Sequence, residues 1–465
     1  MGLVMDGNKL IDNLLSYAVN HLYLNEYDLR YKKSVLCTVL KVKENLNINL
    51  TEDIELSVLV EQLKEFLSEN KVLEADINIA IDYIFGLIMP LPSLVDRSFK
   101  NIREKFGAQK AFMYLYNLAK DADFSSCLDN NYIELETKKP SRIRLKLYSQ
   151  TFYKEVIKNR LNECKITLDF VGNSYILSVA RNALYPYQGV LSKTDNKPVK
   201  INENTLESML AFIEYSPEFF ISTSILEDNN ISLVDKFFVG KDNLPFFKAK
   251  PHFTSKNEIY PDVEVAYLDW YLSTIRLASY NKNTLINSAL EIIDAWNEYS
   301  DSKENVGNAS KNYVSIFASM LADGRYAINL VLNNSTANSK LNSLKEKHEL
   351  FFEKSTANSL ILGVFTLNKN FENIKGLLIN SLTKKQATAP INLENSQAQL
   401  NLLTEFVNEI IKEHGYFKDI QKCETVIFEE LSSMCVELLE SLCAFKTEKN
   451  NFIDVKRFLM SVKIK

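Results

Sequence analysis

The first part of the chain shows the apolar spacing of amphipathic helices. One helical stripe is formed by Leu10, Ile11, Leu14, Leu15, Ala18 and Val19. Similar spacing predicts helices over 58–67 and 77–85. Pro90 and Pro92 then interrupt the pattern, because proline lacks a backbone N–H and biases its predecessor away from helix. We expect one further helix from about Ser93 to Lys120.

From about residue 133 the apolar period changes to two, which predicts strands. Ile143, Leu145 and Leu147 alternate with basic residues, as in a strand with one buried face. Further strands are predicted over 166–170 and 175–179, joined by a hairpin at Gly172 and Asn173. A second hairpin is predicted at 322–325, between strands over 313–320 and 326–332.

Two amphipathic helices lie within this sheet region, over 206–213 and 285–296, and two more follow over 402–411 and 426–442. The polar segment 384–399 contains Pro390, which predicts a loop or a linker. We therefore divide the chain into a helical N-terminal region (1–130), a mixed region of sheet and helix (131–383) and a helical C-terminal region (384–465).

Composition narrows the functional classes. The chain has 465 residues, of which 46% are hydrophobic and 24% are charged. This balance is typical of a globular protein with a packed core. Its net charge of −5 gives no basic field for nucleic acid, and the basic strand around Arg142 and Arg144 reads as a solvated face. Neither a run of twenty apolar residues nor a secretory signal occurs. We expect a cytoplasmic protein with no membrane or nucleic-acid partner.

The cysteines give no sign of a metal centre. Six are scattered along the chain without a Cys-x-x-Cys pair. Cys435 and Cys443 lie among apolar residues, where a packing role is the ordinary one. We therefore expect no bound zinc or iron, no disulfide framework and no cofactor.

Several fragments occur together, in one order, in a known family. They are Gly86–Ser93, Asp121–Phe124, Pro198–Ile201, Tyr260–Val263, Ser273–Leu277, Ala295–Asp301, Asp323–Tyr326, Leu330–Asn334 and Glu413–Lys418. With them the chain resembles UDP-glucose-hexose-1-phosphate uridylyltransferase, the Gram-positive type of galactose-1-phosphate uridylyltransferase. The resemblance implies an α+β fold related to histidine-triad nucleotidyltransferases, with a mainly antiparallel sheet and helical additions at the N- and C-termini. It makes 131–383 the transferase-like region.

The resemblance also implies a site, and this chain departs from it. Family members transfer a uridylyl group through a covalent intermediate on a histidine, carried in a His-x-His-x-Gln motif on a strand. The corresponding positions here are Asp235, Phe237 and Val239. Phenylalanine has no lone pair for phosphorus, and an aspartate repels a diphosphate. The other positions that the resemblance assigns to substrate binding are Gly240, Arg276, Asn333 and Asn334.

The whole chain contains four histidines, His21, His252, His348 and His414, and no two are two residues apart. The leading hypothesis is therefore a catalytically inactive member of the family that binds a sugar nucleotide or a protein partner. UDP-hexose or hexose 1-phosphate would bind weakly, because Phe237 is expected to leave a smaller, more apolar pocket. The alternative is an active nucleotidyltransferase or hydrolase on UDP-hexoses with relocated groups, such as His252 or Asp235. A purely structural role is a third reading.

Overall fold

The computed structural model describes the chain in two compact units. The described residues are 6–43, 45, 47–50, 53–70, 76–125, 132–135, 145–149, 161–194, 199–223, 233–234, 236–300, 312–334, 339–353, 357–368, 370–383, 397–445 and 452–465. Unit 1 comprises 1–127, 153–183 and 187–194, and unit 2 comprises 128–152, 184–186 and 195–465. Each of the three predicted regions is one continuous stretch of the chain, whereas each of these units combines stretches that are separated in the sequence.

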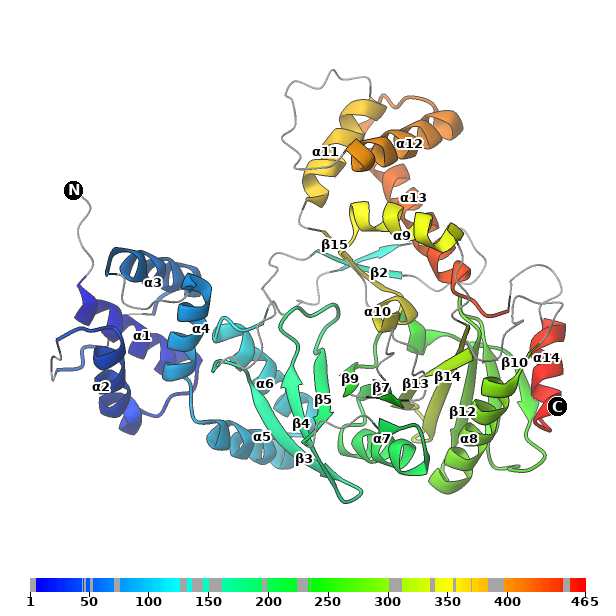
Figure 1. The fold of residues 1–465 in the computed structure, drawn as a ribbon, viewed down its shortest axis with the longest axis horizontal. Helices are drawn as coiled ribbons and strands as arrows, with labels where there is room; N and C mark the ends of the chain where they lie inside the picture. The colour runs from blue at the N-terminus through cyan, green and yellow to red at the C-terminus, as the bar shows by residue number, and fades with distance from the viewer. Residues whose placement is uncertain are drawn as a thin grey trace. The chain divides into compact units, whose positions relative to one another are not determined.

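Unit 1 begins with helices, as the apolar spacing predicts. They are α1 (Gly7–His21), α2 (Leu29–Val39), α3 (Leu56–Asn70), α4 (Ile77–Ile88), α5 (Pro92–Phe106) and α6 (Ala108–Asp121), with the one-turn η1 (Glu26–Asp28) before α2 (Figure 1). Asp6 and Asp76 cap α1 and α4 by accepting hydrogen bonds from the N–H groups of Asn8 and Asn78. Of the predicted stripe of α1, Leu10, Ile11, Leu14, Leu15 and Ala18 are fully buried, and Val19 is partly exposed.

The single helix expected over 93–120 is two helices in the structure. Gly107 has φ +86°, a conformation that ends α5 and that residues with a Cβ rarely adopt. The prediction was wrong there because the apolar spacing continues through the break. In the same unit, β3 (Lys165–Phe170), β4 (Asn173–Val179) and β5 (Gly189–Lys193) pair antiparallel, and Val171 and Gly172 form the β3–β4 turn with positive φ.

Unit 2 contains a larger antiparallel array of strands. Its strands are β7 (Phe219–Thr223), β9 (Lys236–Lys241), β10 (Pro251–Lys256), β11 (Glu264–Leu268), β12 (Thr274–Ser279), β13 (Asn312–Met320) and β14 (Tyr326–Asn334). They are ordered β10-β11-β12-β14-β13-β7-β9. The predicted hairpin between β13 and β14 is present, with Gly324 at φ +86°.

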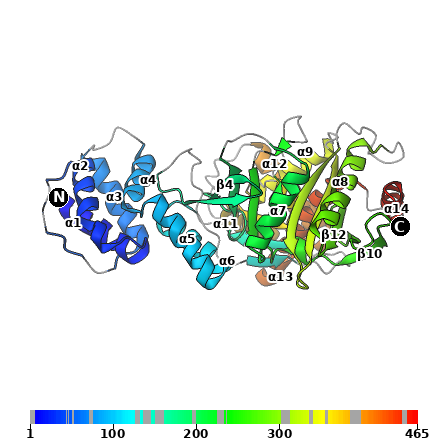
Figure 2. The same cartoon turned by 90° about the horizontal axis from the view of Figure 1, so that it is seen from below.

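One face of this array is covered by α7 (Glu203–Tyr215) and α8 (Lys282–Glu298), which lie along β7, β12, β13 and β14 (Figures 1 and 2). The Tyr326 hydroxyl donates to Glu214 of α7, and the ammonium of Lys282 of α8 lies over the Tyr326 ring. Because antiparallel partners share a face, residues in phase with Tyr326 face the helices. Ile328, Leu330 and Leu332 are among them and are fully buried.

The rest of unit 2 is largely helical toward the C-terminus. The helices are α9 (Ser339–Phe351), α10 (Ala357–Ile361), α11 (Phe371–Leu382), α12 (Gln397–His414), α13 (Ile420–Ser441) and α14 (Phe452–Ser461). A small sheet joins β1 (Tyr132–Leu135) antiparallel and β15 (Val364–Leu367) parallel to β2 (Leu145–Ser149), and β6 (Val199–Lys200) pairs with β8 (Leu233–Val234). The predicted α+β class, its mainly antiparallel sheet and its helical ends are confirmed.

No single helix of the described ranges has the length and apolarity to cross a bilayer. Helices α4 and α5 reach those limits only when taken together, and they are bent by 62°.

Candidate functional site

The predicted motif lies on β9, which pairs with β7. Phe237 is opposite Thr223, and Val239 is opposite Ile221. The register continues from Ile221 through Ala318 to Ile328, so Phe237 and Val239 face the helix-covered side. Both are buried, at 3% and 0% exposure. Asp235 lies outside the described residues.

The opposite face of β9 carries an aromatic cluster instead of a polar cleft. Phe220, opposite Gly240, lies with its ring centroid 5.6 Å from Tyr185 and 6.3 Å from Phe317. Two further rings come from η2 (Pro245–Lys248): Phe247 lies 5.0 Å from Phe220, and Phe246 lies 5.1 Å from Phe317. This aromatic face fills the space over the centre of β7 and β9.

Arg276 lies on the same face, farther along the sheet on β12. It is opposite Asn329, which is opposite Phe317. The guanidinium Nε donates to Asn329 Oδ1 at 2.9 Å, and Asn329 Nδ2 donates to the Phe317 carbonyl at 3.3 Å. Burial lowers the pKa of Arg276 to about 10, and the nearby Glu264 carboxylate opposes that shift. Arg276 therefore remains a cation at neutral pH, held in place by a buried amide.

The two predicted asparagines of β14 point to opposite faces. Asn333 is on the Arg276 face, where its Nδ2 donates to Ser315 Oγ at 2.9 Å and to the Val331 carbonyl. Asn334 is on the helix face, where its Nδ2 donates to Asn312 Oδ1 at 2.6 Å. Both amides are used within the fold.

The structure thus divides the predicted site between two faces. Gly240, Arg276 and Asn333 share one face, while Phe237, Val239 and Asn334 point to the other. On β9 the residues in phase with Gly240 are Lys236 and Phe238. The roles assigned to these positions stay predictions.

None of the four histidines lies on β7, β9 or β13. His21 is on α1 with its Nε2 2.6 Å from Asp53 Oδ1, and His252 is exposed on β10. His348 is buried on α9, with its ring 4.3 Å from that of Phe352. His414 ends α12.

Two residues of this face were missed from the sequence. Tyr185 lies in a Tyr-Pro-Tyr segment, and nothing in that segment indicates that its ring covers Gly240. Asn329 lies in the predicted strand 326–332, where a polar residue among Ile328, Leu330 and Val331 is a visible signal. A buried amide in a strand needs a partner, and that requirement could have pointed to Asn329.

Comparisons with known proteins extend along nearly the whole chain. No family model matches it. Galactose-1-phosphate uridylyltransferase of Clostridium perfringens (strain 13 / Type A) is 23% identical over 503 residues, covering 98% of this chain and 99% of that protein. The enzyme of Ligilactobacillus salivarius (strain UCC118) is 22% identical, covering 99% and 100%. That of Bacillus subtilis (strain 168) is 22% identical, covering 70% and 72%.

Among solved structures, the crystal structure of yeast Ap4A phosphorylase Apa2 is similar, with a TM-score of 0.34 and 8% identity over 57% of this chain and 88% of that chain. The resemblance to the family rests on the sequence identities and not on this structural similarity. The predicted resemblance to galactose-1-phosphate uridylyltransferase is therefore confirmed along nearly the full length of this chain.

Proposed function

We propose that this protein is a relative of galactose-1-phosphate uridylyltransferase that binds a sugar nucleotide without transferring its uridylyl group. The observation that carries the proposal is the pairing of a partly buried cation, Arg276, with a strand whose described residues include no histidine. Uridylyl transfer through a covalent intermediate needs a nucleophile beside the α-phosphorus. The described residues of β9 offer lysine, phenylalanine, valine and glycine.

Neither His252 nor His348 lies where it could replace a nucleophile on β9. His252 lies on β10, and five strands (β11, β12, β14, β13 and β7) separate β10 from β9. At the usual strand spacing, six steps amount to about 29 Å, far beyond the reach of one side chain. His348 is buried between Phe352 and Phe365, where no substrate phosphate can approach it.

Arg276 supports anion binding. Within the described ranges, Asn329 is the residue hydrogen-bonded to its guanidinium, through Nε alone. The two terminal nitrogens are thus left to form the paired hydrogen bonds that suit a phosphate. A partly buried site strengthens such a contact because water competes less. A diphosphate is the anion that the related enzymes' substrates would present.

The aromatic face limits how tightly that ligand binds. The Tyr185 ring occupies the space beside Gly240, so a nucleotide cannot lie close to β9 as well as to Arg276. We expect millimolar affinity for UDP-glucose and UDP-galactose. At a ligand concentration equal to Kd the stabilisation is only about 0.4 kcal/mol, which gives a small rise in Tm.

Catalysis is tested with labelled UDP-glucose and galactose 1-phosphate. The proposal expects neither UDP-galactose nor labelled protein. Turnover that survives in the wild type but disappears in His252→Ala would instead support relocated catalytic groups.

Binding is tested by titrating UDP-glucose and UDP-galactose while following Tm or ligand NMR signals. The Arg276→Met variant should lose the response, whereas Arg457→Met, which removes an arginine of α14 that pairs with Asp454, should keep it. A response that is unchanged in Arg276→Met would contradict the assigned site. A rise of several degrees in the wild type would show that the aromatic face does not restrict binding.

A further inference from the structure

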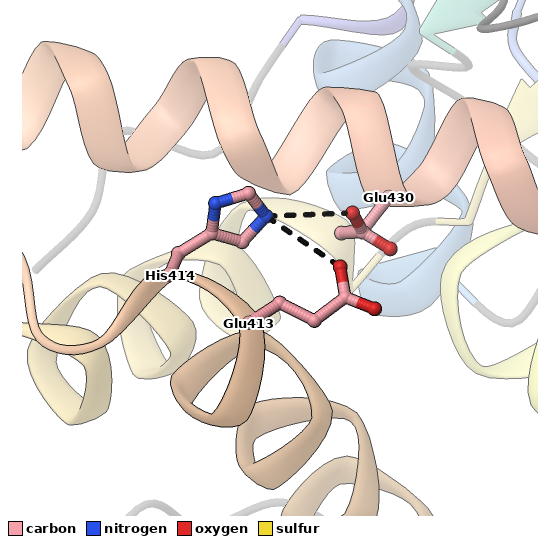
Figure 3. A group of neighbouring side chains, drawn as sticks. All are labelled: Glu413, His414 and Glu430. Carbon is pink, nitrogen blue, oxygen red and sulfur yellow. Dashed lines mark ion pairs between the residues drawn. The ribbon is translucent and has the colours of Figure 1, made fainter.

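Three metal-ligating side chains converge at the junction of α12 and α13. His414 is the last residue of α12, and its Nε2 lies 3.8 Å from Glu413 Oε2 and 3.8 Å from Glu430 Oε1. The ligand atoms of all three residues lie within 4.8 Å of one another. Figure 3 shows the imidazole edge turned toward both carboxylates, which approach it from two different helices.

The fold brings these residues together across sixteen positions of sequence. Gly415 has φ +70° and ends α12, and Asp419 caps α13 by accepting from the Gln421 N–H. The short connection lets Glu430, three turns into α13, lie opposite the end of α12. Phe417 packs in the turn with its ring 6.2 Å from that of His414.

We propose that Glu413, His414 and Glu430 form a binding site for a divalent transition-metal ion such as Zn²⁺. Imidazole nitrogen and carboxylate oxygen are ordinary zinc donors, at about 2.0–2.2 Å from the metal. Tetrahedral geometry then separates two donor atoms by about 3.4 Å. The distances from His414 Nε2 to the two glutamate oxygens, each 3.8 Å, must therefore shorten by only a few tenths of an ångström. Glu413 is exposed at the helix end, so its side chain can rotate to do so.

The surroundings suit a metal with an open coordination position. Glu430 also lines a neighbouring pocket of about 370 Å³. The pocket lining includes two more carboxylates, Glu409 and Glu437, together with Lys347 and the apolar Phe406 and Met434. The pocket gives water and small ligands access to the Glu430 side of the site. Excess negative charge around it favours a cation over an anion.

This site is separate from the proposed nucleotide function, because its ligands come from α12 and α13 and none from the β-strands. A bound ion would tie α13 to the end of α12. Its chemical class follows from the donors: one nitrogen and two carboxylate oxygens favour zinc, cobalt, nickel or copper over magnesium and calcium, which prefer all-oxygen sites.

The test uses the full-length protein, stripped of metal by chelation and titrated with Zn²⁺ against a chromophoric chelator. We expect one zinc ion per chain at micromolar zinc. His414→Ala and Glu430→Gln should each weaken binding by at least about tenfold, since loss of a supporting residue alone often costs that much. Circular dichroism and Tm without metal establish that the variants are folded.

Two matched controls make the assignment specific. Glu429→Gln alters the exposed carboxylate next to Glu430, and His252→Ala alters an exposed histidine elsewhere; both should bind zinc like the wild type. Absence of zinc uptake by the folded wild type overturns the proposal. So does uptake that survives in both His414→Ala and Glu430→Gln, or that disappears with His252→Ala.

Discussion

The ring of Tyr185 lies directly against the backbone of Gly240. A Cβ placed on Gly240 would be 2.6 Å from Tyr185 Cε2 and 2.9 Å from Phe220 Cε1. Glycine is needed at this point of β9 because the two rings leave no room for a side chain. The contact closes the strand face on which a ligand of β9 would have to lie, and it ties the Leu184–Pro186 segment to the sheet.

Replacing Gly240 with alanine should therefore destabilise the protein. The added methyl forces the Tyr185 and Phe220 rings to move within a packed cluster, which costs about 1–3 kcal/mol in typical overpacked cores. Urea unfolding followed by circular dichroism measures the change in free energy of unfolding.

Gly376→Ala is the matched control for this substitution. Gly376 lies within α11, and its Cβ would have nothing within 4 Å. Because alanine favours helix, that variant should gain about 0.5–1 kcal/mol. Equal free energies for the two variants would show that Tyr185 does not close over Gly240.

The Tyr185 hydroxyl gives a second prediction. Tyr185 is 0% exposed, its hydroxyl has no hydrogen-bond partner within the described residues, and burial raises its pKa. Removing an unpartnered buried polar atom is neutral or stabilising, so Tyr185→Phe should match or exceed the wild type in Tm. Tyr185→Ala should lose about 3–5 kcal/mol through the cavity it leaves. A clear loss in Tyr185→Phe would reveal a hydrogen bond that this prediction denies.

Local patterns predicted most of the longer helices and two hairpins, but not strands β7, β10, β11 and β12 or the orientation of the site. The apolar stripe of α1 and the alternation in β13 and β14 are local, and they gave helices and strands close to the observed bounds. The period of two places Phe237 and Val239 together, yet it does not say which face of the sheet the helices cover. That depends on α7 and α8, which are distant in sequence. The metal-ligand group was hidden for the same reason, because Glu430 meets His414 only when α13 folds back.

Arg276 and Asn329 should be energetically coupled through their hydrogen bond. Asn329→Leu leaves the Arg276 Nε and the Phe317 carbonyl without their amide partner, and each buried polar group left unsatisfied costs about 1–3 kcal/mol. In Arg276→Met the cation is absent, so the same asparagine change should cost less. A double-mutant cycle measured by urea unfolding should give a coupling of about 1–2 kcal/mol. Additive single changes would mean that Asn329 does not hold Arg276.

The last prediction concerns the loss of stability at acidic pH. His348 is 3% exposed on α9, its Nε2 has no hydrogen-bond partner among the described residues, and its ring stacks on Phe352. Burial lowers its pKa to about 3, whereas the unfolded chain titrates near 6.5. As the pH falls, His348 therefore takes up its proton at a lower pH in the folded state than in the unfolded state. The stabilising contribution is complete above about pH 6.5 and is lost as pH falls toward 3.

Leucine at this position cannot be protonated, so His348→Leu should remove that loss. Relative to wild type, the free energy of unfolding of His348→Leu should rise by roughly 3 kcal/mol between pH 7 and pH 4, because each pKa unit corresponds to about 1.4 kcal/mol. His252→Leu, at an exposed position, should follow the wild-type pH profile. Urea unfolding at several pH values measures all three proteins. Parallel profiles for wild type and His348→Leu would show that the imidazole is hydrated or hydrogen-bonded in solution, and would leave the acid sensitivity to other groups.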